Sequence, residues 1–346
     1  MATSENPKAS IPAWVFALLS LGVSATLVTL LIVRFKASAV LCCVQSVSSE
    51  WILAAIGVSF ASVLVRVLRW KLLLARSKND WSLRQLFPIT LTGYLFSLIS
   101  PGGMGEIGRA YYAKRRFGHG MEMLSSSVLD KWSGLTGAFV LGLWASLAAG
   151  ETLFAVVAFL GVVVLLIALL ALQRFHMLGI QPLIDRMTKR PGLVALFQVQ
   201  CRPRNPVLIG CLMLAVLGWL LTYFQLFLMY QGLAAPLRLR DVYTVGPLLT
   251  LVSLVPVGWG GIGSRDVAAV VLFQKMGIAA HTTVAACLLF NLTAVIIPAL
   301  FGALVVVWEF FKMMPSSGRS KKGKVLEPAQ GSGAQLAEAS MHHART

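Results

Sequence analysis

The stretch S-L-I-S-P-G-G-M-G-E-I-G-R, residues 97–109, decides how this chain folds, because it interrupts an apolar segment with one proline and four glycines. It occurs again 156 positions later as S-L-V-P-V-G-W-G-G-I-G-S-R, residues 253–265. Lipid offers no partner to unpaired backbone groups, so such a break at membrane depth must face protein or a water-filled cavity. The positions that coincide without a gap are Ser97/Ser253, Leu98/Leu254, Gly102/Gly258, Gly105/Gly261 and Arg109/Arg265.

The composition around these two stretches is that of a membrane protein. Hydrophobic residues make up 57% of the chain and charged residues 12%, with a mean hydropathy of +0.78. Several apolar runs are long enough for a bilayer-spanning helix, which needs about 20 residues. They do not alternate as the strands of a membrane barrel do. We therefore predict an all-α polytopic membrane protein.

The predicted organisation has six full transmembrane helices and two re-entrant helical hairpins. The hairpins cover residues 83–116 and 239–276, and each contains one of the glycine-rich breaks. A short N-terminal segment, residues 1–11, precedes the transmembrane domain, residues 12–311. A basic tail, residues 312–346, is rich in Lys, Ser, Gly and Ala and is expected to be disordered. The full spans are predicted at residues 12–33, 51–71, 124–149, 153–172, 207–230 and 282–311.

The distribution of basic residues predicts the orientation. The N-terminus, the loops 71–84, 112–123 and 173–206, and the tail together contain 20 of the 30 Lys and Arg residues. Cytoplasmic loops carry such an excess, so both termini are expected in the cytoplasm. The first hairpin then enters from the cytoplasm, and the second, three spans later, enters from outside. The repeat is therefore predicted to be inverted, as in many transporters whose binding site lies near the midplane.

The short helix after each break carries one arginine and one carboxylate in its first turns: Glu106 with Arg109, and Arg265 with Asp266. A helix N-terminus attracts anions, and Ser264 is expected to cap the second of these helices. Arginine binds phosphate in a bidentate manner. These four residues therefore predict a substrate site for a lipid phosphate, or alternatively two structural ion pairs that hold the hairpins. The glycines Gly102, Gly105, Gly258 and Gly261 are included in the site because they let a headgroup approach the backbone.

Four further ionisable residues are candidates because charges at membrane depth are costly and usually functional. Arg66 and Arg69 lie on one face of the second predicted helix, where snorkelling to the interface is the alternative. Asp130 and Lys131 lie near the start of the third, where an interfacial ion pair is the alternative. Asn291 in the last helix is expected to make an interhelical hydrogen bond rather than a ligand contact.

Other classes of function are not supported by the sequence. The net charge of +17 fits cytoplasmic loops, and no nucleic-acid-reading module is present, so no nucleic-acid partner is expected. The five cysteines lack zinc or redox spacing, so neither a metal nor another cofactor is expected. The sequence shows no nucleophile–base arrangement and no nucleotide loop. We therefore expect a protein that is not an enzyme.

Three motifs together resemble one known family. They are P-G-G-M-G-E-I-G-R-A-Y-Y, V-L-D-K-W-S-G-L and P-V-G-W-G-G-I-G-S-R-D. They resemble the lysylphosphatidylglycerol synthase transmembrane-region family, the flippase-like domain of the bacterial multiple peptide resistance factor, over about residues 12–310. The family usually has Glu-Arg where this chain has Asp130-Lys131, so a planar arginine contact is lost there. The family positions are Gly105, Glu106, Arg109, Gly260, Gly261, Gly263, Arg265 and Asp266.

The resemblance implies a lipid flippase of the bacterial cytoplasmic membrane, without the soluble synthase domain of the bifunctional relatives. Its expected substrate is a membrane phospholipid or a lipid-linked molecule with an anionic or zwitterionic, phosphate-bearing headgroup. The alternative is a membrane subunit or enzyme of headgroup modification that works with a separately encoded lipid-modifying enzyme. A homo-oligomer is compatible with either function.

Overall fold

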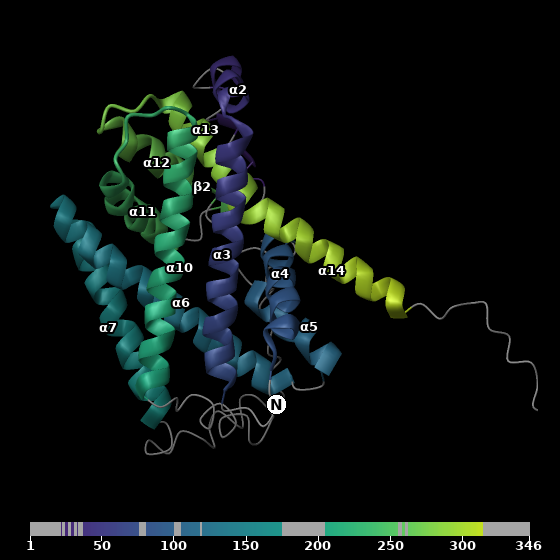
Figure 1. Cartoon of the computed structure of the whole chain (residues 1–346). Helices are drawn as coiled ribbons and strands as arrows, with labels where there is room; N and C mark the ends of the chain where they lie inside the picture. The colour runs from purple at the N-terminus through teal and green to yellow at the C-terminus, as the bar shows by residue number, and fades with distance from the viewer. Residues whose placement is uncertain are drawn as a thin grey trace, which may run out of the picture. The chain divides into compact units, whose positions relative to one another are not determined.

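The computed structural model describes residues 37–75, 81–99, 105–117, 120–174, 205–254, 258–259 and 262–313, with a few single positions before residue 37. Within this part, the chain is helical apart from turns and a two-residue antiparallel ladder (Figure 1). The elements are α2 (Ala37–Ser46), α3 (Ser49–Leu74), α4 (Leu83–Ile99), α5 (Gly105–Phe117), α6 (Gly120–Ala149), α7 (Thr152–Arg174), α10 (Asn205–Gly232), α11 (Leu239–Ser253), β1 (Gly258–Trp259), β2 (Ile262–Gly263), α12 (Ser264–Gln274), α13 (Ala280–Asn291), the π-helix η2 (Leu292–Ile296) and α14 (Ile297–Met313).

Five helical segments of the described chain are long and apolar enough to cross a membrane. They are α3, most of α6, most of α7, α10, and the continuous run from α13 through η2 into α14. They coincide with five of the six predicted spans, which confirms the all-α polytopic class. The first predicted span, residues 12–33, and the predicted tail lie outside the described residues apart from single positions and the end of α14. The described chain up to Val307 forms one compact unit.

The last span contains a π-helical turn, which its apolar sequence does not predict. Pro298, the second residue of α14, has no N–H to donate to the carbonyl four residues earlier. The helix widens into η2 directly before this proline. Such π turns often occur at functional sites, because they change which way the neighbouring side chains point. Here Asn291 ends the regular helix α13, immediately before the π turn.

The helices around the two breaks are too short to cross a membrane individually. They contain 17 residues in α4, 13 in α5, 15 in α11 and 11 in α12. A span needs about 20 residues. Helices α4 and α11 begin at residues 83 and 239, the predicted first residues of the two hairpin segments.

The two long helices that precede these hairpins, α3 and α10, lie side by side and run in opposite directions (Figure 1). Trp51 lies beside Gly232, the Ser62 hydroxyl is 3.5 Å from the Gly218 carbonyl oxygen, and the Cys211 thiol is 3.8 Å from the Arg69 carbonyl oxygen. Residue numbers therefore rise along α3 as they fall along α10. At the crossing, Ser62 meets Gly218, the residue 156 positions later.

Two pairs of helices begin at positions that differ by the same spacing of 156. Helices α3 and α10 begin at residues 49 and 205, and helices α4 and α11 begin at 83 and 239. The helices α3 to α6 and the helices α10 to α13 are the two halves of the molecule, and each half has its own hydrophobic core. One core is built mainly by α3, α4, α5 and α6 around Trp70, and the other mainly by α10, α11, α12 and α13 around Tyr230 and Phe273.

Gly302 allows α14 to approach the backbone of α4 closely. A β-carbon at Gly302 would lie 2.2 Å from the Leu91 carbonyl oxygen, a distance that requires the helices to separate. Gly302→Ala is therefore expected to lower stability by about 1–3 kcal/mol, as overpacking does. The measurement is the midpoint of thermal unfolding in detergent.

Gly57→Ala is the matched control for this substitution. Gly57 lies on the exposed side of α3 with nothing within 4 Å of an added β-carbon. Alanine favours helix over glycine by about 1 kcal/mol, so this variant should be unchanged or slightly more stable. Equal midpoints for the two variants would contradict a close α4–α14 contact.

Candidate functional site

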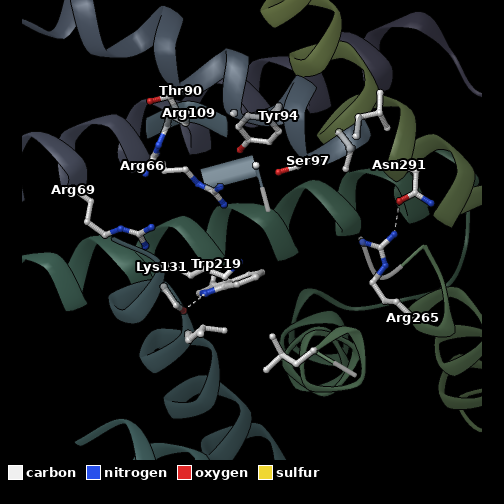
Figure 2. Close-up of a pocket in the computed structure, with 17 residues that line it drawn as sticks. Arg66, Arg69, Thr90, Tyr94, Ser97, Arg109, Lys131, Trp219, Arg265 and Asn291 are labelled. Atoms are coloured by element: carbon white, nitrogen blue, oxygen red, sulfur yellow. Dashed lines mark hydrogen bonds between the residues drawn. The ribbon is translucent and has the colours of Figure 1, made fainter. Parts of the chain in front are cut away.

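A cavity of about 310 Å³ lies between the two halves and is lined by basic side chains from both (Figure 2). Its charged wall residues are Arg66, Arg69, Arg109, Lys131 and Arg265. In Figure 2 the first four of these lie toward one side and Arg265 lies with Asn291 toward the other. No aspartate or glutamate lines it within the part of the chain that the structure describes. The cavity is therefore suited to an anion.

One carboxylate, that of Asp130, joins two of these arginines from outside the lining. Arg69 Nε donates to Asp130 Oδ1 at 2.6 Å, and Arg109 Nη2 donates to Asp130 Oδ2 at 3.1 Å. All three side chains are buried, with relative exposures of 9%, 2% and 2% for Arg69, Arg109 and Asp130. Three helices, α3, α5 and α6, are thus tied together at a charged cluster. Arg69 does not snorkel to the interface.

Arg109 has an additional contact and an unused donor. Its guanidinium carbon lies 4.0 Å from the centre of the Trp70 ring, a cation–π contact, and the Trp70 indole N–H donates to the Ser126 hydroxyl. Arg109 Nε is buried and has no hydrogen-bond partner in the described structure. A buried donor without a partner is costly.

Arg66 and Lys131 complete this side of the cavity. Arg66 lies one turn before Arg69 on the same face of α3, and its guanidinium carbon is 5.3 Å from the centre of the Tyr94 ring. Lys131 follows Asp130 on α6 and is exposed to the cavity rather than buried with its neighbour. Successive helical residues point in different directions, which explains why Asp130 and Lys131 face different surroundings.

On the other side, Arg265 is held in place by two residues. Its Nη2 donates to Asp266 Oδ1 at 3.1 Å and to the Asn291 side-chain oxygen. The Asn291 amide in turn donates to Asp266 Oδ2 at 3.3 Å. Arg265 also lies 4.9 Å above the centre of the Phe290 ring. The interhelical hydrogen bond expected of Asn291 is confirmed, since it joins α13 to Arg265 and Asp266 of α12, and Asn291 also lines the cavity.

Gly263, rather than Ser264, is the N-cap of α12. The helix begins at Ser264, and the backbone N–H of Gly263 donates to Asp266 Oδ2 at 3.2 Å. Gly263 has a φ of 100°, which side chains rarely adopt, so a glycine is needed here. The expectation that Ser264 caps the helix was wrong, because its hydroxyl is buried without a partner.

The four glycines predicted to belong to the site lie in different places, and two of them fall outside the described residues. Gly105 lines the cavity, and a β-carbon there would lie 2.3 Å from the Gly93 carbonyl oxygen, so it permits the close contact of α5 with α4. Gly258 lies in β1 and pairs with Gly263. Gly102 and Gly261 lie outside the described residues, as does the side chain of Glu106. The predicted pairing of Glu106 with Arg109 is thus not described, whereas that of Asp130 with Arg109 is.

No cluster of three or more His, Cys, Asp or Glu side chains that could hold a metal ion occurs among the described residues. The four cysteines in that part of the chain are free thiols.

The long apolar helices and the arginine-lined internal cavity define a multi-pass membrane protein with a site suited to anions. The chain belongs to the family described as the lysylphosphatidylglycerol synthase TM region, whose model matches residues 17–302. It is also similar to a UPF0104 membrane protein of the archaeon Methanothermobacter thermautotrophicus. The two are 23% identical over 266 residues, which cover 68% of this chain and 78% of that relative.

Proposed function

We propose that this protein translocates a phosphate-bearing lipid across the cytoplasmic membrane, as a bacterial flippase, without changing the lipid chemically. The observation that carries the proposal is that Arg109 and Arg265, from the two glycine-broken hairpins, line the same cavity. Guanidinium groups bind phosphate through charge-assisted, bidentate hydrogen bonds. A headgroup in the cavity would meet both hairpins while its acyl chains stay in the lipid.

The two halves are proposed to form an inverted repeat, in which the hairpins enter from opposite sides of the membrane. Supporting observations are the spacing of 156 between the starts of α3 and α10 and between those of α4 and α11, and the antiparallel packing of α3 and α10. Exchange of conformation between two inverted halves exposes one central site to each side in turn. Both termini are then cytoplasmic, as the distribution of basic residues predicts.

Transport by the full-length protein in lipid vesicles tests the function. Phosphatidylglycerol carrying an acyl-chain fluorophore is placed in both leaflets, and the fraction quenched by external dithionite is followed with time. We expect quenching to extend to the inner leaflet only in vesicles that contain the protein. Vesicles that quench at the rate of protein-free vesicles would contradict the proposal, and appearance of a chemically altered lipid would favour headgroup modification instead.

Cysteine accessibility tests the inverted arrangement. Arg84, Lys114, Arg240 and Lys275 are exposed residues at the outer ends of the two hairpins. Single cysteines at 84 and 114 should react only with reagents that reach the cytoplasm, and those at 240 and 275 with an impermeant reagent added outside. Each re-entrant hairpin thus has both ends on one side. Labelling of 84 and 114 from opposite sides would show that the first hairpin spans.

A further inference from the structure

A second cavity of about 260 Å³ adjoins the arginine-lined cavity and lies toward α10 and α11. The two cavities share Arg66, Tyr94, Trp219, Arg265 and Val295, so they lie next to each other along these side chains and differ in the rest of their lining. The second cavity is lined by five hydroxyl-bearing Ser and Thr residues as well as by Tyr223 and Gln225. The lining of the second cavity therefore concerns the part of a lipid headgroup that extends beyond the phosphate.

Several hydroxyl groups that line this second cavity donate their protons in hydrogen bonds to backbone carbonyl oxygens. Ser62 and Thr222 both donate to the Gly218 carbonyl oxygen, at 3.5 and 2.9 Å, and Ser253 donates to the Thr250 carbonyl oxygen at 2.6 Å. A hydroxyl that donates its only proton retains lone pairs that accept. These three hydroxyl groups therefore present acceptors, and a ligand that bonds to them must supply donors.

The charge around the second cavity distinguishes between two kinds of ligand donor, an ammonium group and a neutral hydroxyl group. An ammonium group would lie near Arg66 and Arg265, and like charges in a partly dehydrated cavity repel strongly. No aspartate or glutamate lines the second cavity in the described part of the chain. The carboxylate of Asp266 is engaged by Arg265, Asn291 and the Gly263 N–H, and that of Asp130 by two other arginines. A neutral hydroxyl remains as the favoured donor.

We propose that the second cavity is a subsite for a neutral, hydroxylated headgroup, whose phosphate lies against the arginines of the first cavity. The phosphate end is supported by the basic side chains that line the first cavity, among them Arg109 and Arg265. The proposal rests on the transport function above and narrows it: the substrate is a net anionic phospholipid with a polyol headgroup. Lipids whose headgroup carries an amine are disfavoured.

Three lipids of one acyl composition, each with the same acyl-chain fluorophore, test the subsite in vesicles of phosphatidylcholine containing the full-length protein. Phosphatidylglycerol has hydroxyl donors, phosphatidylethanol has the same charge without a hydroxyl, and phosphatidylethanolamine carries an ammonium. We expect phosphatidylglycerol to cross about threefold to tenfold faster than phosphatidylethanol, the effect of one neutral hydrogen bond or a little more. Phosphatidylethanolamine is expected to be the slowest.

The variant Thr222→Val removes one acceptor with little change of shape. It should slow phosphatidylglycerol by about threefold to tenfold and leave phosphatidylethanol unchanged. Thr244→Val is the matched control, since Thr244 makes the same kind of bond to a carbonyl four residues earlier but lines neither cavity. The unchanged rate for phosphatidylethanol also shows that the variant is folded.

Equal rates for phosphatidylglycerol and phosphatidylethanol in the unaltered protein, or the fastest rate for phosphatidylethanolamine, would overturn the subsite while transport itself stands. An equal loss for both anionic lipids in Thr222→Val would also overturn it. If none of the three lipids crosses faster than in protein-free vesicles, the subsite and the proposed function both fail.

Discussion

Asp130→Ala is expected to lower the stability of the folded protein by about 3–5 kcal/mol, the usual effect of removing one partner from a buried ion pair. The carboxylate contacts Arg69 and Arg109 at 2.6 and 3.1 Å and is buried with both. Its loss would leave two guanidinium groups close together without a counter-charge. Asp130→Asn keeps an acceptor of the same shape, so its effect should be smaller but in the same direction.

The measurement is the midpoint of thermal unfolding in detergent, which is obtained from the fraction of protein that remains monodisperse after heating. Glu151→Gln is the control, because Glu151 forms an exposed ion pair with Lys275 at 3.9 Å. Exposed pairs contribute about 0–1 kcal/mol, so this midpoint should barely move. Similar midpoints for Asp130→Ala and Glu151→Gln would show that the three-helix cluster does not hold the fold.

Arg265→Ala is expected to reduce transport of fluorescent phosphatidylglycerol by about tenfold to a hundredfold. Hydrogen bonds to charged groups contribute about 1.5–3 kcal/mol each, and 1.4 kcal/mol corresponds to a factor of ten. Arg265 is a sharper test than Arg109, because its side chain is 18% exposed and Asp266 keeps Asn291 and the Gly263 N–H as partners. Arg109, by contrast, is completely buried with Asp130, so its removal would also affect folding.

Arg265→Lys should give an intermediate rate, since lysine keeps the charge but loses the planar fork. Arg240→Ala, at an exposed position outside the cavity, is the control for loss of a basic residue from the same half. Transport by Arg265→Ala at the rate of Arg240→Ala, with equal amounts of folded protein, would remove the main support for the proposed site.

Much of the fold could be predicted from the sequence, because apolar length and glycine-rich breaks act locally. Five spans and the first residues of both hairpin segments, Leu83 and Leu239, agree with the structure. The π turn before Pro298 was not predicted, since a proline inside a helix can also simply bend it. Its effect depends on the helices packed around it.

The partners within the site were harder to predict, because they come from packing between helices. The spacing of Glu106 and Arg109 suggested a pair within one helix. The structure places Asp130, 21 residues away on α6, against Arg109, whereas the side chain of Glu106 lies outside the described residues. Similarly, Asp130 and Lys131 are adjacent in sequence, but Asp130 is buried against two arginines whereas Lys131 lines the cavity. Local spacing shows which residues are able to meet, whereas tertiary contacts decide which of them do.

The crossing of α3 and α10 at Ser62 and Gly218 has a consequence for how such a chain can change over generations. Where two copies of a unit cross at equivalent positions, each residue on the axis faces its own counterpart, so only small side chains fit on both sides. Once the copies are joined in one chain, positions away from the axis can diverge independently. Asp130 and Asp266 correspond, at the spacing of 156, to Ala286 and Ala110. Each half thus has an acid where the other has alanine, and each acid holds an arginine of the cavity wall in place.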